Sequence, residues 1–321
     1  KSHGDTADAR WLALKRAGAI GVATIAAPRA GGPGGGRAGA PAAAPATPPA
    51  GAQPAGAAPQ GAGRAGGTPQ PTITLFDREL NDAAGEKIAM TLTARGAAAV
   101  LEGTNHTIDE LNQLVLDAKP LPTFALSATL KAQAALKSDP IDSQNIVGVI
   151  PGSDPVLKSE YVIMSAHLDH VGIGRAVNGD ALYNGAMDDA SGIASMIETA
   201  RLLASSGEKV KRSVIFIAVT AEEKGELGSQ YFAMRPTVPA NKIVADINLD
   251  MFLPLYPLKV IEVQGLTESS LGESVRAAAK TLGVDVQTDR EPEQNRFIRS
   301  DQYSFIRRGV PALAFKFGYE F

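Results

Sequence analysis

A cluster of histidine and aspartate residues behind one apolar stretch constrains the fold of this 321-residue chain most strongly. Residues 161–164 (YVIM) predict a buried strand, and His167, Asp169 and His170 follow it directly. Residues 188–189 are paired aspartates that precede a helical pattern. In open α/β sheets, ligands gather where the carboxyl ends of strands meet the following loops. This arrangement therefore predicts a metal site.

Two later strand patterns also end in carboxylates. Residues 213–220 (SVIFIAVT) are apolar and end in Ala-Glu-Glu, which places Glu222 and Glu223 at the strand end. Residues 243–249 (IVADINL) end in Asp250. Any one of these acids alone fits a helix cap or a surface charge. Three such strand ends, together with a loop of paired aspartates, favour one shared site. For Asp189 taken alone, a helix cap or a surface charge is the favoured interpretation.

Helical and strand patterns alternate through the second half of the chain. After the paired aspartates, apolar side chains recur at helical spacing, and this face is expected to pack on a sheet: Ile193, Met196, Ile197, Ala200 and Leu203. Residues 259–264 predict a strand, residues 269–282 a helix and residues 310–317 the last strand. Alternation of this kind predicts an α/β fold, with an open, mostly parallel sheet covered by helices on both faces.

Charge and composition exclude several classes of protein. The net charge is -3 and the sequence pI is about 5.9, and no basic patch indicates a nucleic-acid partner. The chain has no cysteine, so it has neither a disulfide framework nor thiol chemistry. No apolar run approaches the roughly 20 residues that a membrane span needs. The chain begins at Lys1 without a visible signal peptide, and we expect that its start has been removed or that it is a fragment.

The N-terminal third has a different character. Residues 8–17 predict a helix, and a glycine turn followed by a strand-like stretch at 22–25 completes one α/β unit. Residues 27–70 are almost entirely Ala, Gly and Pro, which predicts a disordered insertion. A glycine-rich phosphate loop is a weak alternative, because Gly-Lys-Ser/Thr is missing. Beyond it we predict a strand, a helix and a strand: residues 71–76, 77–93 and 97–101.

Five segments, taken together and in order, closely resemble the zinc peptidases of the M28 family: SQNIVGVIPGSDP, VIMSAHLDHVGIG, NGDALYNGAMDDASGIA, VTAEEKGELGS and ADINLDM. The resemblance is to bacterial aminopeptidase-like members that carry an inserted protease-associated (PA) domain, and it covers about residue 143 to the end. It implies an M28-like catalytic domain at residues 141–321, incomplete at both ends of the chain. Residues 1–140 would form a smaller PA-like domain, interrupted by the insertion at about 27–70.

The resemblance implies a site for two Zn²⁺ ions. Asp188 matches the carboxylate that bridges the metals. His167 and Asp250 match the terminal ligands of one zinc, and Glu223 matches a ligand of the other. A co-catalytic site of this kind needs such N and O ligands on each ion.

The resemblance also assigns roles beyond metal binding. Glu222 matches the general base that takes a proton from the attacking water and passes it to the leaving amine. Asp169 matches the carboxylate that orients a ligating histidine through its other ring nitrogen. The family often has a cis peptide bond after the bridging residue, which here would join Asp188 to Asp189.

The sequence departs from the family pattern at the second zinc. The family uses a fifth ligand, a late histidine, but the four histidines of this chain all precede Asp250. We expect that the sequence ends before that ligand; a genuine loss of the ligand is the alternative. His170 is expected to be structural or outside the ligand set, because after a strand it would not share a face with His167. Gln302 stands where many relatives carry histidine, and we expect it to weaken any substrate contact from that position.

These observations lead to a zinc-dependent aminopeptidase that hydrolyses N-terminal residues from peptides. Two alternatives stay open: another dinuclear zinc enzyme that processes amides, and a metal-depleted M28-like binding or scaffold protein. Localisation outside the cytoplasm, secreted or periplasmic, is implied by the resemblance alone.

Overall fold

The computed structural model describes residues 3–25, 72–77, 80, 88–131, 133, 137–207, 209–252 and 257–318. The predicted insertion at residues 27–70 lies outside these described residues. In the described part of the chain, no helix is both long enough and apolar enough to span a membrane.

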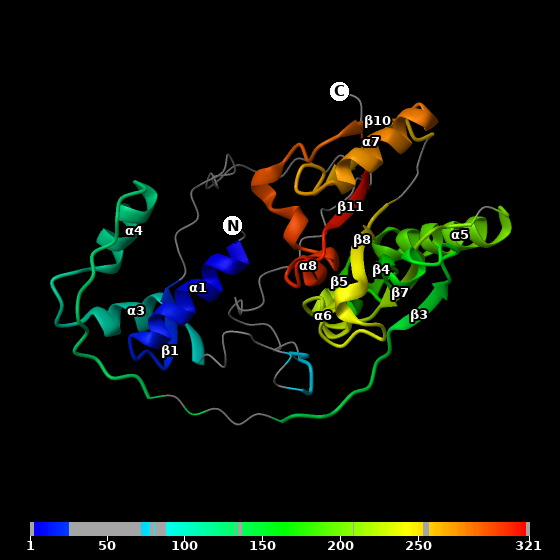
Figure 1. The fold of residues 1–321 in the computed structure, drawn as a ribbon. Coiled ribbons are helices and arrows are strands. Elements are labelled where there is room, and N and C mark those ends of the chain that lie inside the picture. The colour runs from blue at the N-terminus through cyan, green and yellow to red at the C-terminus, as the bar shows by residue number, and fades with distance from the viewer. Residues whose placement is uncertain are drawn as a thin grey trace.

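A seven-stranded sheet forms the centre of the C-terminal region (Figure 1). Its order is β10-β9-β11-β8-β4-β7-β3. Within the described sheet, β3 with β7 and β9 with β11 are the antiparallel pairs, and the other neighbours are parallel. The strands are β3 (Ile146–Ile150), β4 (Tyr161–His167), β7 (Ser213–Val219), β8 (Ile243–Leu249), β9 (Val260–Gln264), β10 (Asp285–Gln287) and β11 (Ala312–Phe317). The predicted α/β fold with an open, mostly parallel sheet is confirmed.

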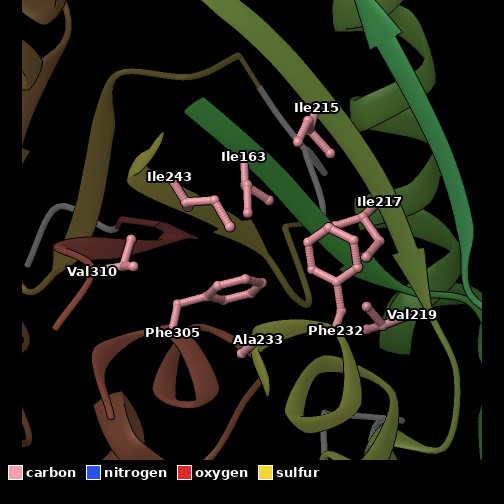
Figure 2. Packing of buried hydrophobic residues seen from close by; sticks show 9 residues of the cluster. All are labelled: Ile163, Ile215, Ile217, Val219, Phe232, Ala233, Ile243, Phe305 and Val310. Carbon is pink, nitrogen blue, oxygen red and sulfur yellow. The ribbon is translucent and has the colours of Figure 1, made fainter. Parts of the chain in front are cut away.

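Helices α6 (Leu227–Met234) and α8 (Gln302–Ile306) cover one face of this sheet. Figure 2 shows Phe232 of α6 and Phe305 of α8 pointing toward the strand residues. Their ring centroids lie 6.3 Å apart. The cluster also contains Ile163, Ile215, Ile217, Val219, Ala233, Ile243 and Val310. Because side chains alternate along a strand, the strand residues between these isoleucines point to the opposite face of the sheet.

Helices α5 (Ser191–Ser205) and α7 (Leu271–Leu282) cover that opposite face. Met196 of α5 is buried against Phe216 and Ala218 of β7. The predicted apolar face of α5 is confirmed at Ile193, Met196, Ala200 and Leu203. It is wrong at Ile197, whose side chain is 61% exposed. The sheet is thus covered on both faces, and its strand ends remain as the open edge.

The N-terminal elements confirm some predictions and overturn others. Helix α1 (His3–Arg16) and strand β1 (Gly21–Ile25) match the predicted α/β unit. Strand β2 (Ile88–Leu92) pairs in parallel with β1, so the predicted helix through Thr93 is wrong there. Residues 72–76 form no strand. The interpretation of residues 1–140 as a PA-like domain stays a prediction.

The predicted strand at residues 97–101 is instead part of helix α3 (Ala94–Leu101). Its sequence, ARGAAAVL, is rich in alanine, the best helix former. Thr93 caps this helix, because its side-chain oxygen accepts a hydrogen bond from the Gly96 N–H at 3.1 Å. Helix α4 (Ile108–Leu116) follows and begins with a capping box between Thr107 and Glu110.

Candidate metal centre

Three adjacent strands bring the predicted site residues together. Strands β8, β4 and β7 are parallel neighbours, so their carboxyl ends meet at one edge of the sheet. His167 ends β4. Glu222 and Glu223 lie just beyond β7, and Asp250 lies just beyond β8. Asp188 enters from the turn that precedes α5. The strand-end argument therefore placed these side chains correctly.

The Asp188 carboxylate lies between two histidines. Its Oδ1 is 2.9 Å from His167 Nε2, and its Oδ2 is 3.8 Å from His170 Nδ1. Two groups with metal-ligand geometry result: His167 with Asp189 and Asp250, and His170 with Asp188 and Glu223. Within each group the potential ligand atoms all lie within 4.8 Å of one another. One carboxylate therefore offers an oxygen to each of two neighbouring positions.

The His167 ring is held with its Nε2 atom directed at carboxylates. The side chain is 1% exposed, and Nδ1 lies 2.7 Å from the backbone carbonyl oxygen of Asp169. A carbonyl oxygen only accepts, so Nδ1 carries the hydrogen and Nε2 presents a lone pair in the neutral ring. Nε2 makes no hydrogen bond although Asp188 and Asp250 oxygens lie 2.9 and 3.9 Å away. A lone pair facing anionic oxygens fits a cation placed between them.

Several acids around this position have raised pKa values, because burial and neighbouring carboxylates disfavour their charged form. Burial, with the nearby Asp301 carboxylate, raises the pKa of Glu222 to about 10. Burial and the neighbouring Asp250 raise the pKa of Asp189 to about 8. Burial and Asp188 also raise the pKa of Glu223. Each shift reports negative charge gathered in a volume of low polarity, and a divalent cation would reverse this balance.

Two side chains can offset part of that negative charge: Lys316 and, in its protonated form, His167. Burial alone would lower the pKa of His167, but the Asp188 and Asp250 carboxylates raise it to about 11. Lys316 of β11 places its Nζ 3.7 Å from Asp250 Oδ1. The donor set and its excess of acid fit a site for divalent cations with N and O ligands.

The Asp169 carboxylate does not touch the histidine, and the predicted orienting role is corrected in this respect. The backbone oxygen of Asp169 makes that contact. The carboxylate oxygens instead accept hydrogen bonds from the Ala221 N–H at 2.8 and 2.7 Å and from Thr220 Oγ1 at 3.0 Å. Ala221 has a φ of 57°, in the left-handed region that disfavours a residue with a Cβ. Asp169 thus holds the turn that presents Glu222 and Glu223.

Asp189 does the same at the end of β8. Its Oδ1 accepts from the Met251 N–H at 3.0 Å, and Met251 has a φ of 59°. The same oxygen accepts from the Gly192 N–H at 3.0 Å in the first turn of α5, whose N-cap residue is Ala190. Its Oδ2 accepts from the His167 N–H at 3.3 Å. The peptide bond between Asp188 and Asp189 is cis, as the resemblance implied.

Gln302 is fully buried, and its expected effect on a substrate contact stays a prediction. Its Nε2 donates to the Phe297 carbonyl at 2.8 Å, and its Oε1 accepts from Asn248 Nδ2 at 2.7 Å. Asn248 lies on β8 and is also fully buried. The glutamine therefore links the start of α8 to β8 through a buried hydrogen bond.

Sequence reasoning missed two residues of this centre. His170 had been expected to lie outside the ligand set, but the structure groups it with Asp188 and Glu223. Its spacing from His167 was the available signal, and the path of the loop was not visible in that spacing. Lys316 carried no signal, because its place depends on β11 lying beside β8.

The sequence comparisons agree with this picture. Residues 145–320 match the family model described as Peptidase family M28. A probable leucine aminopeptidase 2 of Aspergillus fumigatus is 34% identical over 187 residues, which cover 54% of this chain and 34% of that protein. Aminopeptidase Y of Saccharomyces cerevisiae is 28% identical over 219 residues, 66% of this chain and 37% of that protein. The chain therefore spans well under half the length of these relatives.

Solved structures include a zinc aminopeptidase from Bacillus subtilis, with 27% identity, a TM-score of 0.44, and coverage of 55% of this chain and 40% of that one.

Proposed function

Because the chain belongs to peptidase family M28, we propose that it is a zinc-dependent metallopeptidase, and within that class an aminopeptidase that removes N-terminal residues from peptides. One observation carries the proposal: the two oxygens of Asp188 face two different histidines, with Asp250 beside one and Glu223 beside the other. The names of two relatives support the aminopeptidase assignment: probable leucine aminopeptidase 2 of Aspergillus fumigatus and aminopeptidase Y of Saccharomyces cerevisiae.

We propose two zinc ions for this centre. His167 and Asp250 would hold one ion, Glu223 would hold the other, and Asp188 would touch both. Zinc takes imidazole nitrogen and carboxylate oxygen ligands readily. When bound, the metal supplies a Lewis acid and lowers the pKa of a bound water toward neutrality. All the remaining steps fall to side chains of this chain.

Glu222 is the proposed general base. It is 8% exposed and lies at the same strand end as Glu223. Its carboxylate accepts the proton that the attacking water loses, and then delivers that proton to the leaving amine.

The test is the variant Glu222→Gln, assayed with aminoacyl anilide substrates on zinc-loaded protein. We expect turnover to fall by at least about 100-fold, the lower range for loss of acid–base catalysis, while zinc content stays unchanged. The matched control is Glu198→Gln, because Glu198 lies on the exposed side of α5 in an ion pair with Arg201. Unchanged turnover in Glu222→Gln would contradict the base assignment. Localisation outside the cytoplasm stays a prediction.

A further inference from the structure

We propose that His170 is a ligand of the second metal ion, through its Nδ1 atom and together with Asp188 and Glu223. This inference rests on the metal centre of the proposed function and names a ligand that the family resemblance does not supply. His170 offers an imidazole to the half of the centre where Asp188 and Glu223 offer carboxylates.

The distances around His170 Nδ1 suit a metal ion. Nδ1 lies 2.7 Å from Glu223 Oε1 and 3.8 Å from Asp188 Oδ2. Ligand atoms around a tetrahedral zinc lie about 3.3–3.4 Å apart, given metal–ligand distances of roughly 2.0–2.1 Å. The two observed distances bracket this value. A small opening of the Glu223 contact would therefore bring His170 Nδ1 and Glu223 Oε1 to the spacing of zinc ligands.

The Nδ1 atom is buried and makes no hydrogen bond. Its distance to Glu223 Oε1 is short enough for one, but the direction is wrong. An imidazolium–carboxylate ion pair, the simplest alternative, would direct an N–H at that oxygen. Buried polar atoms in proteins almost always have a partner. An unpaired ring nitrogen beside two carboxylates is the arrangement that a metal ion satisfies.

The neighbouring chain is shaped to receive this ring. Gly185 has a φ of +65°, and a Cβ placed there would lie 2.8 Å from the His170 Cβ and 2.9 Å from the Asp188 carbonyl oxygen. The Tyr183 ring flanks the imidazole, with 6.3 Å between ring centroids. A glycine is thus required at the point where the Asp188 turn passes His170. The close approach of His170 and Asp188 is built into the backbone.

The two histidines present different ring nitrogens to the centre. His167 is held through Nδ1 by the Asp169 carbonyl and directs Nε2 inward. His170 directs Nδ1 inward. Because metal binding changes the ¹⁵N chemical shift of the bound nitrogen, the two ligands have distinguishable signatures in long-range ¹H–¹⁵N spectra of the imidazoles.

The first experiment counts zinc per chain after loading and dialysis. We expect two ions in the unmodified chain and one in His170→Asn, which keeps a polar side chain of similar reach but is a poor zinc ligand. The matched control is His106→Asn, which should keep two ions, because His106 pairs with Glu110 of α4 and belongs to neither ligand group. The second experiment titrates the ¹⁵N-labelled unmodified chain with zinc. We expect the Nδ1 signal of one histidine and the Nε2 signal of another to move, and His170→Asn to remove the first.

The outcomes separate this inference from the proposed function. Two ions in His170→Asn would overturn the ligand assignment and leave the two-zinc enzyme intact. One ion in both the unmodified chain and His170→Asn would overturn the assignment and leave a single-metal centre at His167. No bound zinc in the unmodified chain would overturn both. If His170→Asn does not fold, an unmoved Nδ1 signal in the unmodified chain would overturn the assignment by itself.

Discussion

The two halves of the centre are built in different ways. The His167 half belongs to the sheet: His167 ends β4, Asp250 follows β8, and their side chains are 1% and 11% exposed. The His170 half belongs to loops: His170 and Glu223 lie beyond strand ends and are 19% and 18% exposed. Strand register fixes the first half, and glycine-dependent loop packing fixes the second. We therefore expect the first ion to be held more tightly than the second.

Each half nevertheless depends on an aspartate that is not a simple ligand. Asp169 accepts the N–H of Ala221 beyond β7, and Asp189 accepts the N–H of Met251 beyond β8. Both donors are in the left-handed backbone region. For residues with a Cβ, such positions cost on the order of 1–3 kcal/mol and persist only when the surroundings enforce them. The hydrogen bonds from Asp169 and Asp189 stabilise these two backbone turns, which lie next to Glu222 and Asp250.

The largest effect should come from Asp188→Ala, because this carboxylate is the contact common to both halves. We expect zinc affinity in both halves to fall by more than the roughly 10–100-fold that loss of an indirect partner costs, and turnover to disappear. Isothermal titration with zinc measures this loss. Asp139→Ala is the control, since Asp139 is exposed and pairs with Lys137. Survival of one tight ion in Asp188→Ala would show that the halves are independent.

A smaller and one-sided effect is expected from Asp169→Asn. The Asp169 backbone oxygen still holds His167, but an amide cannot accept from Ala221 and Thr220 through both of its polar atoms. The Glu222–Glu223 turn should loosen, and the second ion should bind roughly 10–100-fold more weakly. Titration of zinc into this variant would show the two binding steps separating.

Asp154→Asn is the matched control for that variant. Asp154 Oδ1 accepts from the backbone N–H groups of Val156 and Leu157, but it is not part of either ligand group. It should leave both zinc affinities unchanged. Equal weakening of both ions in Asp169→Asn would break the distinction between the halves.

Zinc removal by a chelator should proceed in two phases. The ligands of the second ion are more exposed than His167 and Asp250. The fast phase should therefore release the second ion. A difference of about 1.4 kcal/mol between the two release barriers would make this phase roughly tenfold faster. A metal-sensitive dye in stopped flow follows the release. The fast phase should be missing in His170→Asn. A single phase in the unmodified chain would show that the halves hold metal equally.

The smallest effect, and one that should spare both halves, is expected from Asp246→Asn. Asp246 is fully buried on β8, accepts from Ser165 Oγ at 2.9 Å, and has an unpaired Oδ2. Burial raises its pKa well above the usual 3.8. Between the ordinary and the raised pKa, the folded state binds more protons than the unfolded state, so stability falls as pH rises. A single group of this kind contributes at most about 1.4 kcal/mol per pH unit.

Asparagine cannot ionise, so Asp246→Asn should remove this contribution from the pH dependence of unfolding while zinc content stays the same. Urea unfolding of the metal-free chain at several pH values above 4 measures the slope. Identical slopes in the variant and the unmodified chain would show that Asp246 is not held in its neutral form.

The parts of the site that the sequence predicted are those that follow from strands. Apolar runs marked β4, β7 and β8, and parallel neighbours necessarily place His167, Glu223 and Asp250 at one edge. His170 could not be placed in the same way, because its position depends on the backbone at Gly185 rather than on any periodicity. The Asp169 carboxylate was given the wrong partner, because the competing donors at Ala221 and Thr220 appear only when β4 and β7 are adjacent.

The fold shows the same division. Long apolar strands and the amphipathic helix α5 were predicted correctly, because burial of a repeated pattern determines them. The N-terminal elements are short, and α3 and β2 were assigned the wrong type. In stretches of five to eight residues a local cap such as Thr93, or a pairing partner such as β1, decides the outcome.

The most direct test of the central claim, that Asp188 joins two unlike metal positions, is anomalous X-ray scattering at the zinc edge from crystals of the zinc-loaded chain. The account predicts two peaks on either side of the Asp188 carboxylate. One should lie against His167 and Asp250, and the other, at lower occupancy, against His170 and Glu223. A single peak, or a second peak out of reach of His170 Nδ1, would contradict it.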